Sequence, residues 1–194
     1  ELEITGKVVS DIGLRLESVY IGGGTPGILS PEQLEKVCSV VENSFDLSSV
    51  REYTVELGRP DTVTREKLEV LRAHSVDRIS INTQTLNDSV LEAVGRKHTA
   101  ADFFAAYALA KESGFENINV DLIAGLPGDT LESFKKSVDG VAALAPTNIT
   151  VHALALKSAS TLKEHGHAVS EGETAGKMID YSHRVLFDSG YIPY

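Results

Sequence analysis

The chain has 194 residues, 42% of them hydrophobic and 24% charged, a composition typical of one globular domain and not of a disordered protein. A net charge of −10 without any basic cluster argues against a nucleic-acid partner, and no apolar run is long enough to span a membrane. The single cysteine, Cys38, excludes an internal disulfide and a cysteine-rich metal site within this chain, and it fits a reducing, cytoplasmic location.

Apolar, β-branched segments recur along the chain and predict strands separated by helices. The predicted strands cover residues 19–23, 52–57, 78–84, 117–123 and 148–154, and residues 191–194 resemble the start of a sixth. Strands that are almost continuously apolar and alternate with helices predict an α/β fold with a parallel sheet. An open doubly wound sheet and a barrel are both compatible with this periodicity.

Helix start signals support the same organisation. Ser30–Gln33 has the pattern of a capping box with proline at the first helical position. Further helix starts are predicted at Thr99, at Asp129–Glu132 and at Ser170. The helix after Ser30 has one apolar stripe, formed by Leu34, Val37, Cys38 and Val41. Cys38 is therefore interpreted as a buried core residue and not as a reactive thiol.

Polar residues interrupt four predicted strands near their carboxyl ends, where ligands bind in α/β sheets and barrels. These residues are Glu56, Gln84, Asp121 and His152. Each also has a purely structural interpretation: Asp121 can cap or pair with a basic neighbour, and His152 can be a satisfied core histidine. Several such residues at one level favour a shared ligand site.

The segment VYIGGGTPGILS places Gly22, Gly23 and Gly24 at the end of the first predicted strand. It lacks the lysine and the spacing of a P-loop, and it does not match GxGxxG. A tight turn alone would explain three glycines. The alternative is that bare backbone carbonyls accept hydrogen bonds from a ligand, and this alternative predicts a ligand that carries an amine.

Five motifs in this order resemble the radical S-adenosylmethionine enzymes, and among them the oxygen-independent coproporphyrinogen III oxidase and coproporphyrinogen dehydrogenase group. The motifs are GGGTP at 22–26, ELGRP at 56–60, RISINTQTLND at 78–88, GRKH at 95–98 and NINVDLIAGLPGDT at 117–130. The resemblance extends from about Val19 to Leu156 and implies a partial (β/α) barrel of six strands. NTQ and GRP are variants of the more usual family residues.

The resemblance also implies a set of cofactor contacts. Gly23, Gly24 and Thr25 are expected to hold the amino group of S-adenosylmethionine, and Arg96 its carboxylate. The remaining contacts, to its amino and ribose groups and to its adenine, are expected from Glu56, Gln84, Asp121 and Ala155.

Enzymes of this family hold a 4Fe–4S cluster with three cysteines that this sequence does not contain. We therefore expect residues 1–194 to be one partial-barrel domain truncated at both ends, without the first strand and the cluster loop, and inactive alone. The whole protein is expected to decarboxylate porphyrinogen propionates to vinyl groups in haem synthesis, with a tetrapyrrole substrate and an electron donor as partners. One alternative is a haem chaperone, since relatives of this barrel bind haem. A third interpretation keeps the barrel only as a structural remnant that binds nothing, and the concentration of Glu56, Gln84, Arg96 and Asp121 argues against it.

Overall fold

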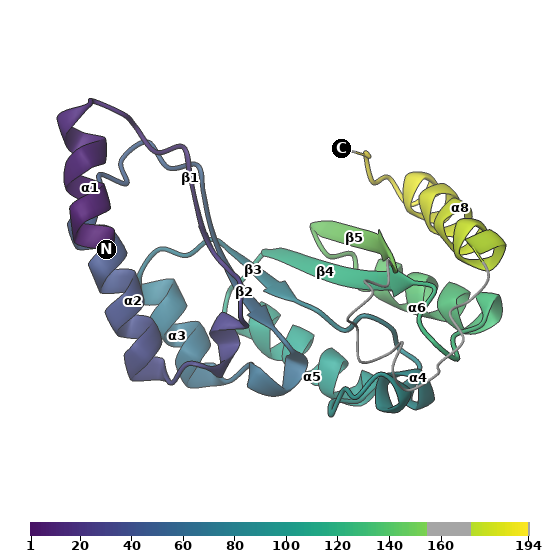
Figure 1. The fold of residues 1–194 in the computed structure, drawn as a ribbon. Coiled ribbons are helices and arrows are strands. Elements are labelled where there is room, and N and C mark those ends of the chain that lie inside the picture. Colours follow the sequence, from purple (N-terminus) through teal and green to yellow (C-terminus); the bar gives the residue numbers. More distant parts are fainter. Residues whose placement is uncertain (155–171, 194) are drawn as a thin grey trace. The chain divides into compact units, whose positions relative to one another are not determined.

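The computed structural model describes residues 1–154 and 172–193, and it divides into two compact units. Unit 1 comprises Glu1–Ile81 and Ala106–Ile118, and unit 2 comprises Asn82–Ala105 and Asn119–Tyr194. The strands follow chain order in the sheet, β1-β2-β3-β4-β5, with helices between them (Figure 1). The expected α/β class is confirmed.

Unit 1 begins with a helix and continues with alternating strands and helices. Its elements are α1 (Leu2–Asp11), β1 (Ser18–Ile21), the 3₁₀ helix η1 (Pro26–Ile28), α2 (Pro31–Ser44), β2 (Glu52–Gly58), the 3₁₀ helix η2 (Pro60–Thr62), α3 (Arg65–Ala73) and β3 (Arg78–Ile81). Both strand pairs, β1 with β2 and β2 with β3, are parallel, and Tyr20 lies opposite Thr54. The register between β2 and β3 shifts between Glu56 and Gly58, at the end where the candidate site lies.

The predicted capping box at the start of α2 is confirmed. The Ser30 hydroxyl accepts from the Gln33 backbone N–H, and the Gln33 side chain accepts from the Ser30 N–H at 2.9 Å. The predicted stripe is buried at Leu34, Cys38 and Val41, while Val37 is half-buried. α2 packs against both α1 and α3 (Figure 1). The stripe thus belongs to the core of unit 1, and Cys38 is buried as expected.

Unit 2 contains the remaining elements. They are α4 (Asp88–Ala93), α6 (Leu131–Ala143), β5 (Asn148–Ala153) and α8 (Gly172–Asp188), while α5 (Ala100–Glu112) and β4 (Asn117–Ala124) contribute residues to both units. β4 and β5 are parallel, with Asp121 opposite Thr150 and Ile123 opposite His152. α8 packs against α6 and β5. None of the helices in the described ranges combines the length and apolarity that crossing a membrane requires.

The structure differs from the sequence predictions at several points, and β1 ends at Ile21 instead of Gly23. β3 ends at Ile81 and does not reach Gln84, and the backbone of Gln84 lies outside the extended region, with a φ angle of 71°. The cap of α6 is Thr130, and its reciprocal partner is Ser133, which stands one position beyond the predicted Glu132. Residues 191–193 form no strand. The predicted helix start at Ser170 lies outside the described residues, and α8 is described from Gly172.

Candidate functional site

The glycine segment after β1 is an open turn. β1 ends at Ile21, and the three glycines that follow are exposed. Gly23 and Thr25 have φ angles of 109° and 62°, and the Thr25 N–H donates to the Gly23 carbonyl at 2.9 Å. A Cβ built at Gly23 or Gly24 would meet no atom within 4 Å. The glycines at the tip are therefore not required by internal packing, and their backbone is accessible to a ligand.

The base of this turn is fixed, unlike its tip. Pro26 and Gly27 are buried, and a Cβ at Gly27 would lie 2.1 Å from the Leu57 carbonyl oxygen. Lys67 of α3 donates from Nζ to the Gly27 carbonyl at 2.5 Å and to the Thr62 carbonyl at 3.0 Å. Desolvation lowers the pKa of Lys67, although the nearby Asp61 carboxylate opposes this effect. The exposed carbonyls are thus held on a preorganised support.

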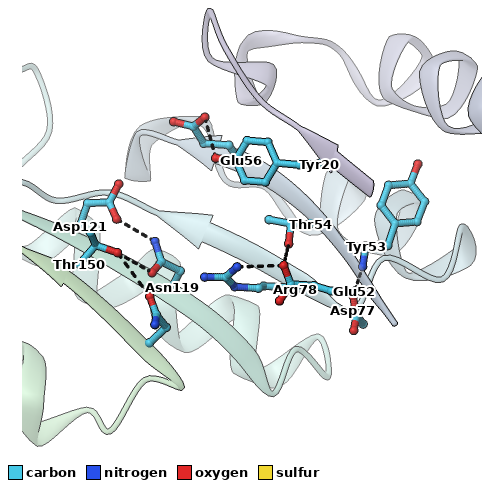
Figure 2. A network of polar contacts seen from close by, with 11 residues as sticks. Tyr20, Glu52, Tyr53, Thr54, Glu56, Asp77, Arg78, Asn119, Asp121 and Thr150 are labelled. Carbon is cyan, nitrogen blue, oxygen red and sulfur yellow. Dashed lines mark hydrogen bonds and ion pairs between the residues drawn. The ribbon is translucent and has the colours of Figure 1, made fainter. Parts of the chain in front are cut away.

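Glu56 lies beside the turn. It is half-buried on β2, and its Oε2 accepts a hydrogen bond from the Tyr20 hydroxyl at 3.2 Å (Figure 2). A Cβ at Gly22 would lie 3.0 Å from the same Oε2 atom, so the carboxylate lies close to the first glycine of the turn. Carbonyl oxygens and a carboxylate are hydrogen-bond acceptors, so this corner of unit 1 suits an ammonium group.

Gln84 of unit 2 has the strained geometry often found at binding sites. Its φ angle is 71°, which is uncommon for a residue other than glycine. The strain is held by two backbone hydrogen bonds, from the Gln84 N–H to the Asp121 carbonyl at 3.0 Å and from the Ile123 N–H to the Gln84 carbonyl at 2.8 Å. The side chain is buried, and within the described ranges its Oε1 has no hydrogen-bond partner. An unsatisfied buried acceptor is costly and calls for a donor such as a ligand.

Asp121, on β4 next to the Gln84 backbone, has polar neighbours on one face of the β4–β5 pair. Its Oδ1 accepts from Asn119 Nδ2 at 2.7 Å, and the Thr150 hydroxyl donates to Asn119 Oδ1 at 3.2 Å (Figure 2). His152 Nε2 lies 4.0 Å from Asp121 Oδ2, and its imidazole is more than half exposed. His152 is therefore not the satisfied core histidine of the structural interpretation. Asp121 is held by an amide and neighbours an accessible imidazole.

The last two predicted contact residues are Arg96 and Ala155. Arg96 is half-buried in the loop between α4 and α5, and its backbone N–H donates to the Leu91 carbonyl at 2.9 Å. The preceding Gly95 has a φ angle of 75°, which turns the chain into this loop. Ala155 lies outside the described residues. The structure thus groups Gly23, Gly24, Thr25 and Glu56 in unit 1, and Gln84, Arg96 and Asp121 belong to unit 2.

Sequence reasoning missed two residues of unit 1, Tyr20 and Lys67. The alternation of side chains along β1 could have indicated Tyr20, because it shares a strand face with Gly22. Lys67 has no comparable signal, since its two acceptors are backbone carbonyls from other segments.

Metal ligands form no candidate cluster in the described part of the chain, where no group of three or more histidine, cysteine or acidic side chains is arranged to hold an ion. A cluster held by three thiolates does not fit this chain's own residues, because Cys38 is its single cysteine and is fully buried.

Comparison with known proteins gives consistent matches. The sequence model of the Radical SAM superfamily matches residues 4–140. The chain is 38% identical to the oxygen-independent coproporphyrinogen-III oxidase-like protein HemZ of Bacillus subtilis, over 100% of this chain and 39% of that protein. It is 34% identical to the heme chaperone HemW of Lactococcus lactis, over 93% of this chain and 48% of that protein.

A solved structure gives the corresponding result for the fold. Coproporphyrinogen III oxidase (HemN) from Escherichia coli, described as a radical SAM enzyme, superposes with a TM-score of 0.85 at 26% identity, over 98% of this chain and 45% of that one. This match confirms the expected partial (β/α) barrel. The chain spans less than half the length of each of these three proteins.

Proposed function

Because the chain belongs to the radical S-adenosylmethionine superfamily, we propose that it binds S-adenosylmethionine for an enzyme of the oxygen-independent coproporphyrinogen III oxidase type. The observation that carries this proposal is the corner of unit 1, where the open turn at Gly23 and Gly24 lies beside the Glu56 carboxylate. This arrangement presents several acceptors to a primary ammonium, and S-adenosylmethionine carries one.

In this proposal each predicted residue is assigned to one part of the molecule. The carbonyls of Gly23, Gly24 and Thr25, together with Glu56, accept hydrogen bonds from the ammonium. In unit 2, Arg96 donates to the carboxylate, and Asp121 accepts from the ribose hydroxyls. Gln84 supplies its buried Oε1 as a further acceptor. Backbone at Ala155 is assigned to the adenine by resemblance alone.

The residues of this chain orient the cofactor and shield it, and the chemistry comes from the cofactor. Bound S-adenosylmethionine would supply the radical chemistry for which the superfamily is named. The fixed base of the glycine turn supports this role, since Lys67 holds the Gly27 carbonyl and so anchors the segment from which the open tip extends. An anchored base reduces the entropy that the turn loses when the ligand binds.

For the substrate we propose a porphyrinogen, whose propionate side chains are oxidatively decarboxylated to vinyl groups. The relative named as a coproporphyrinogen-III oxidase-like protein supports this reaction. The relative named as a heme chaperone supports the alternative, in which haem is bound and no propionate is lost. Two experiments distinguish these functions, both on a protein that joins this chain to a cluster-binding segment. The first is product analysis after incubation with coproporphyrinogen III, and the second is titration with haem. Vinyl products support the oxidase, and haem binding without vinyl products supports the chaperone.

Calorimetric titration of the present chain tests the binding proposal. Gly24→Ala should weaken binding of S-adenosylmethionine at least about tenfold, because the new methyl group occupies the open side of the turn where the ligand approaches. Gly176→Ala in α8 is the matched control, since a Cβ there also meets nothing within 4 Å. Absence of binding by the wild-type chain at millimolar ligand, or equal affinities for both variants, would contradict the proposal.

Variants in unit 2 test the remaining contacts. Asp121→Ala and Arg96→Ala each remove one charged hydrogen-bonding partner, which costs about 2 to 3 kcal/mol in a desolvated site. That range corresponds to a loss of about 30-fold to 150-fold in affinity. Unchanged affinity in both variants would remove these two residues from the site.

A further inference from the structure

Tyr20 hydrogen-bonds to one residue of the proposed site, Glu56, although it stands in β1 among apolar residues. We infer that Tyr20 is a positioning residue for the Glu56 carboxylate: its hydroxyl holds Oε2 and leaves Oε1 to accept from a ligand ammonium. The inference deepens the proposed function and rests on it, because it requires Glu56 to bind the ammonium of S-adenosylmethionine.

The strand register brings the two side chains together. Tyr20 lies opposite Thr54, so Glu56 is its diagonal neighbour two residues further along β2. Tyr20, Thr54 and Glu56 therefore point to the same face of the sheet, because side chains alternate along a strand with a period of two. The result is the hydrogen bond of 3.2 Å from the Tyr20 hydroxyl to Glu56 Oε2 (Figure 2).

Gly22 provides the space that this contact needs. A Cβ at Gly22 would lie 2.2 Å from Tyr20 Cε1 and 3.0 Å from Glu56 Oε2. Any side chain at this position would therefore displace the tyrosine ring, the carboxylate or both. The absence of a side chain at Gly22 is thus coupled to the Tyr20–Glu56 contact, whereas Gly23 and Gly24 have open space around them.

The exposure and charge of Tyr20 also fit a positioning role. The side chain is 62% exposed, so its ring contributes little to the core. A tyrosine hydroxyl is an uncharged hydrogen-bond donor. It therefore holds the carboxylate without placing a competing positive charge beside it. A lysine or arginine in the same position would compete with the ligand.

Tyr20→Phe removes the hydroxyl and keeps the ring. Calorimetry on this chain should show about fivefold weaker binding of S-adenosylmethionine and S-adenosylhomocysteine, both of which carry the amine. Binding of 5′-methylthioadenosine, which lacks the amino-acid group, should change by less than about twofold. This selectivity separates a positioning role from a general structural one.

Tyr181→Phe is the matched control, because the Tyr181 hydroxyl in unit 2 also donates to a carboxylate, that of Asp139, at 2.8 Å. It should leave the affinity for all three compounds unchanged. Gly22→Ala is a second variant, since its methyl group displaces the ring, the carboxylate or both and so breaks the Tyr20–Glu56 contact, and it should reproduce the selective loss if Tyr20→Phe fails to fold.

The outcomes separate the inference from the proposed function. If Glu56→Gln weakens S-adenosylmethionine binding and Tyr20→Phe does not, the inference is overturned and the proposed function stands. An equal loss for 5′-methylthioadenosine in Tyr20→Phe also overturns it, because the ring would then support the site as a whole. If the wild-type chain binds none of the amine-bearing compounds, both proposals fail.

Discussion

Replacement of Gly27 by alanine tests whether the base of the glycine turn is packed as tightly as the structure indicates. The new Cβ would lie 2.1 Å from the Leu57 carbonyl oxygen and 2.3 Å from Thr62 Oγ1. The Leu57 oxygen belongs to the backbone of β2 and cannot rotate away, so the strand or the turn has to shift. Thr62 can move only by giving up hydrogen bonds from its hydroxyl to the Leu57 carbonyl at 3.0 Å and the Arg59 carbonyl at 2.6 Å.

These contacts set the expected magnitude. Inserting a methyl group into a packed site costs about 1 to 3 kcal/mol, and the hydrogen bond that the single Thr62 hydroxyl proton shares between the two carbonyls contributes about 1 kcal/mol. We therefore expect Gly27→Ala to lower the free energy of unfolding by about 2 to 4 kcal/mol. With a denaturant dependence of about 2 kcal/mol per molar urea, the unfolding midpoint should fall by about 1 to 2 M.

Urea unfolding followed by circular dichroism is the assay, and Gly24→Ala is the control from the same turn. Gly24 is exposed and has open space for a Cβ, so this variant should remain within about 0.5 kcal/mol of the wild type. A Gly27→Ala protein as stable as Gly24→Ala would show that the turn does not pack against the end of β2.

Two further predictions concern unit 1. Burial lowers the pKa of His74, but hydrogen bonds from its two ring nitrogens to Glu35 and Glu42, both 2.9 Å, outweigh this effect and raise the pKa above the ordinary value. Protonated His74 therefore stabilises the folded state fully below about pH 6.5, and this stabilisation is lost as the pH rises through the raised pKa of the folded state. The urea midpoint of the wild-type chain should fall over that pH range, and the midpoint of His74→Gln should fall less. Equal pH profiles for both proteins would refute the assignment. Burial raises the pKa of the fully buried Cys38 thiol, so at pH 8 a chromogenic disulfide reagent should label it only after unfolding, and rapid labelling of the native chain would contradict its core position.

The sequence alone determined the features that depend on local patterns. The capping box at Ser30 and the buried stripe through Cys38 follow from neighbours within one or two helical turns, and both are present. All five strands occur close to their predicted ranges, because β-branched apolar runs mark buried strands. The family motifs indicated the S-adenosylmethionine contacts residue by residue, and these assignments stay predictions.

Only the tertiary structure decided how these residues are held. The Tyr20–Glu56 hydrogen bond depends on the register between two strands, and the Lys67–Gly27 bond joins segments 40 residues apart. The end of β3 was predicted too late, because the left-handed backbone at Gln84 is held by hydrogen bonds with β4 and not by its own sequence neighbours. Local propensity is written in adjacent residues, whereas register and long-range donors are fixed only when the chain packs.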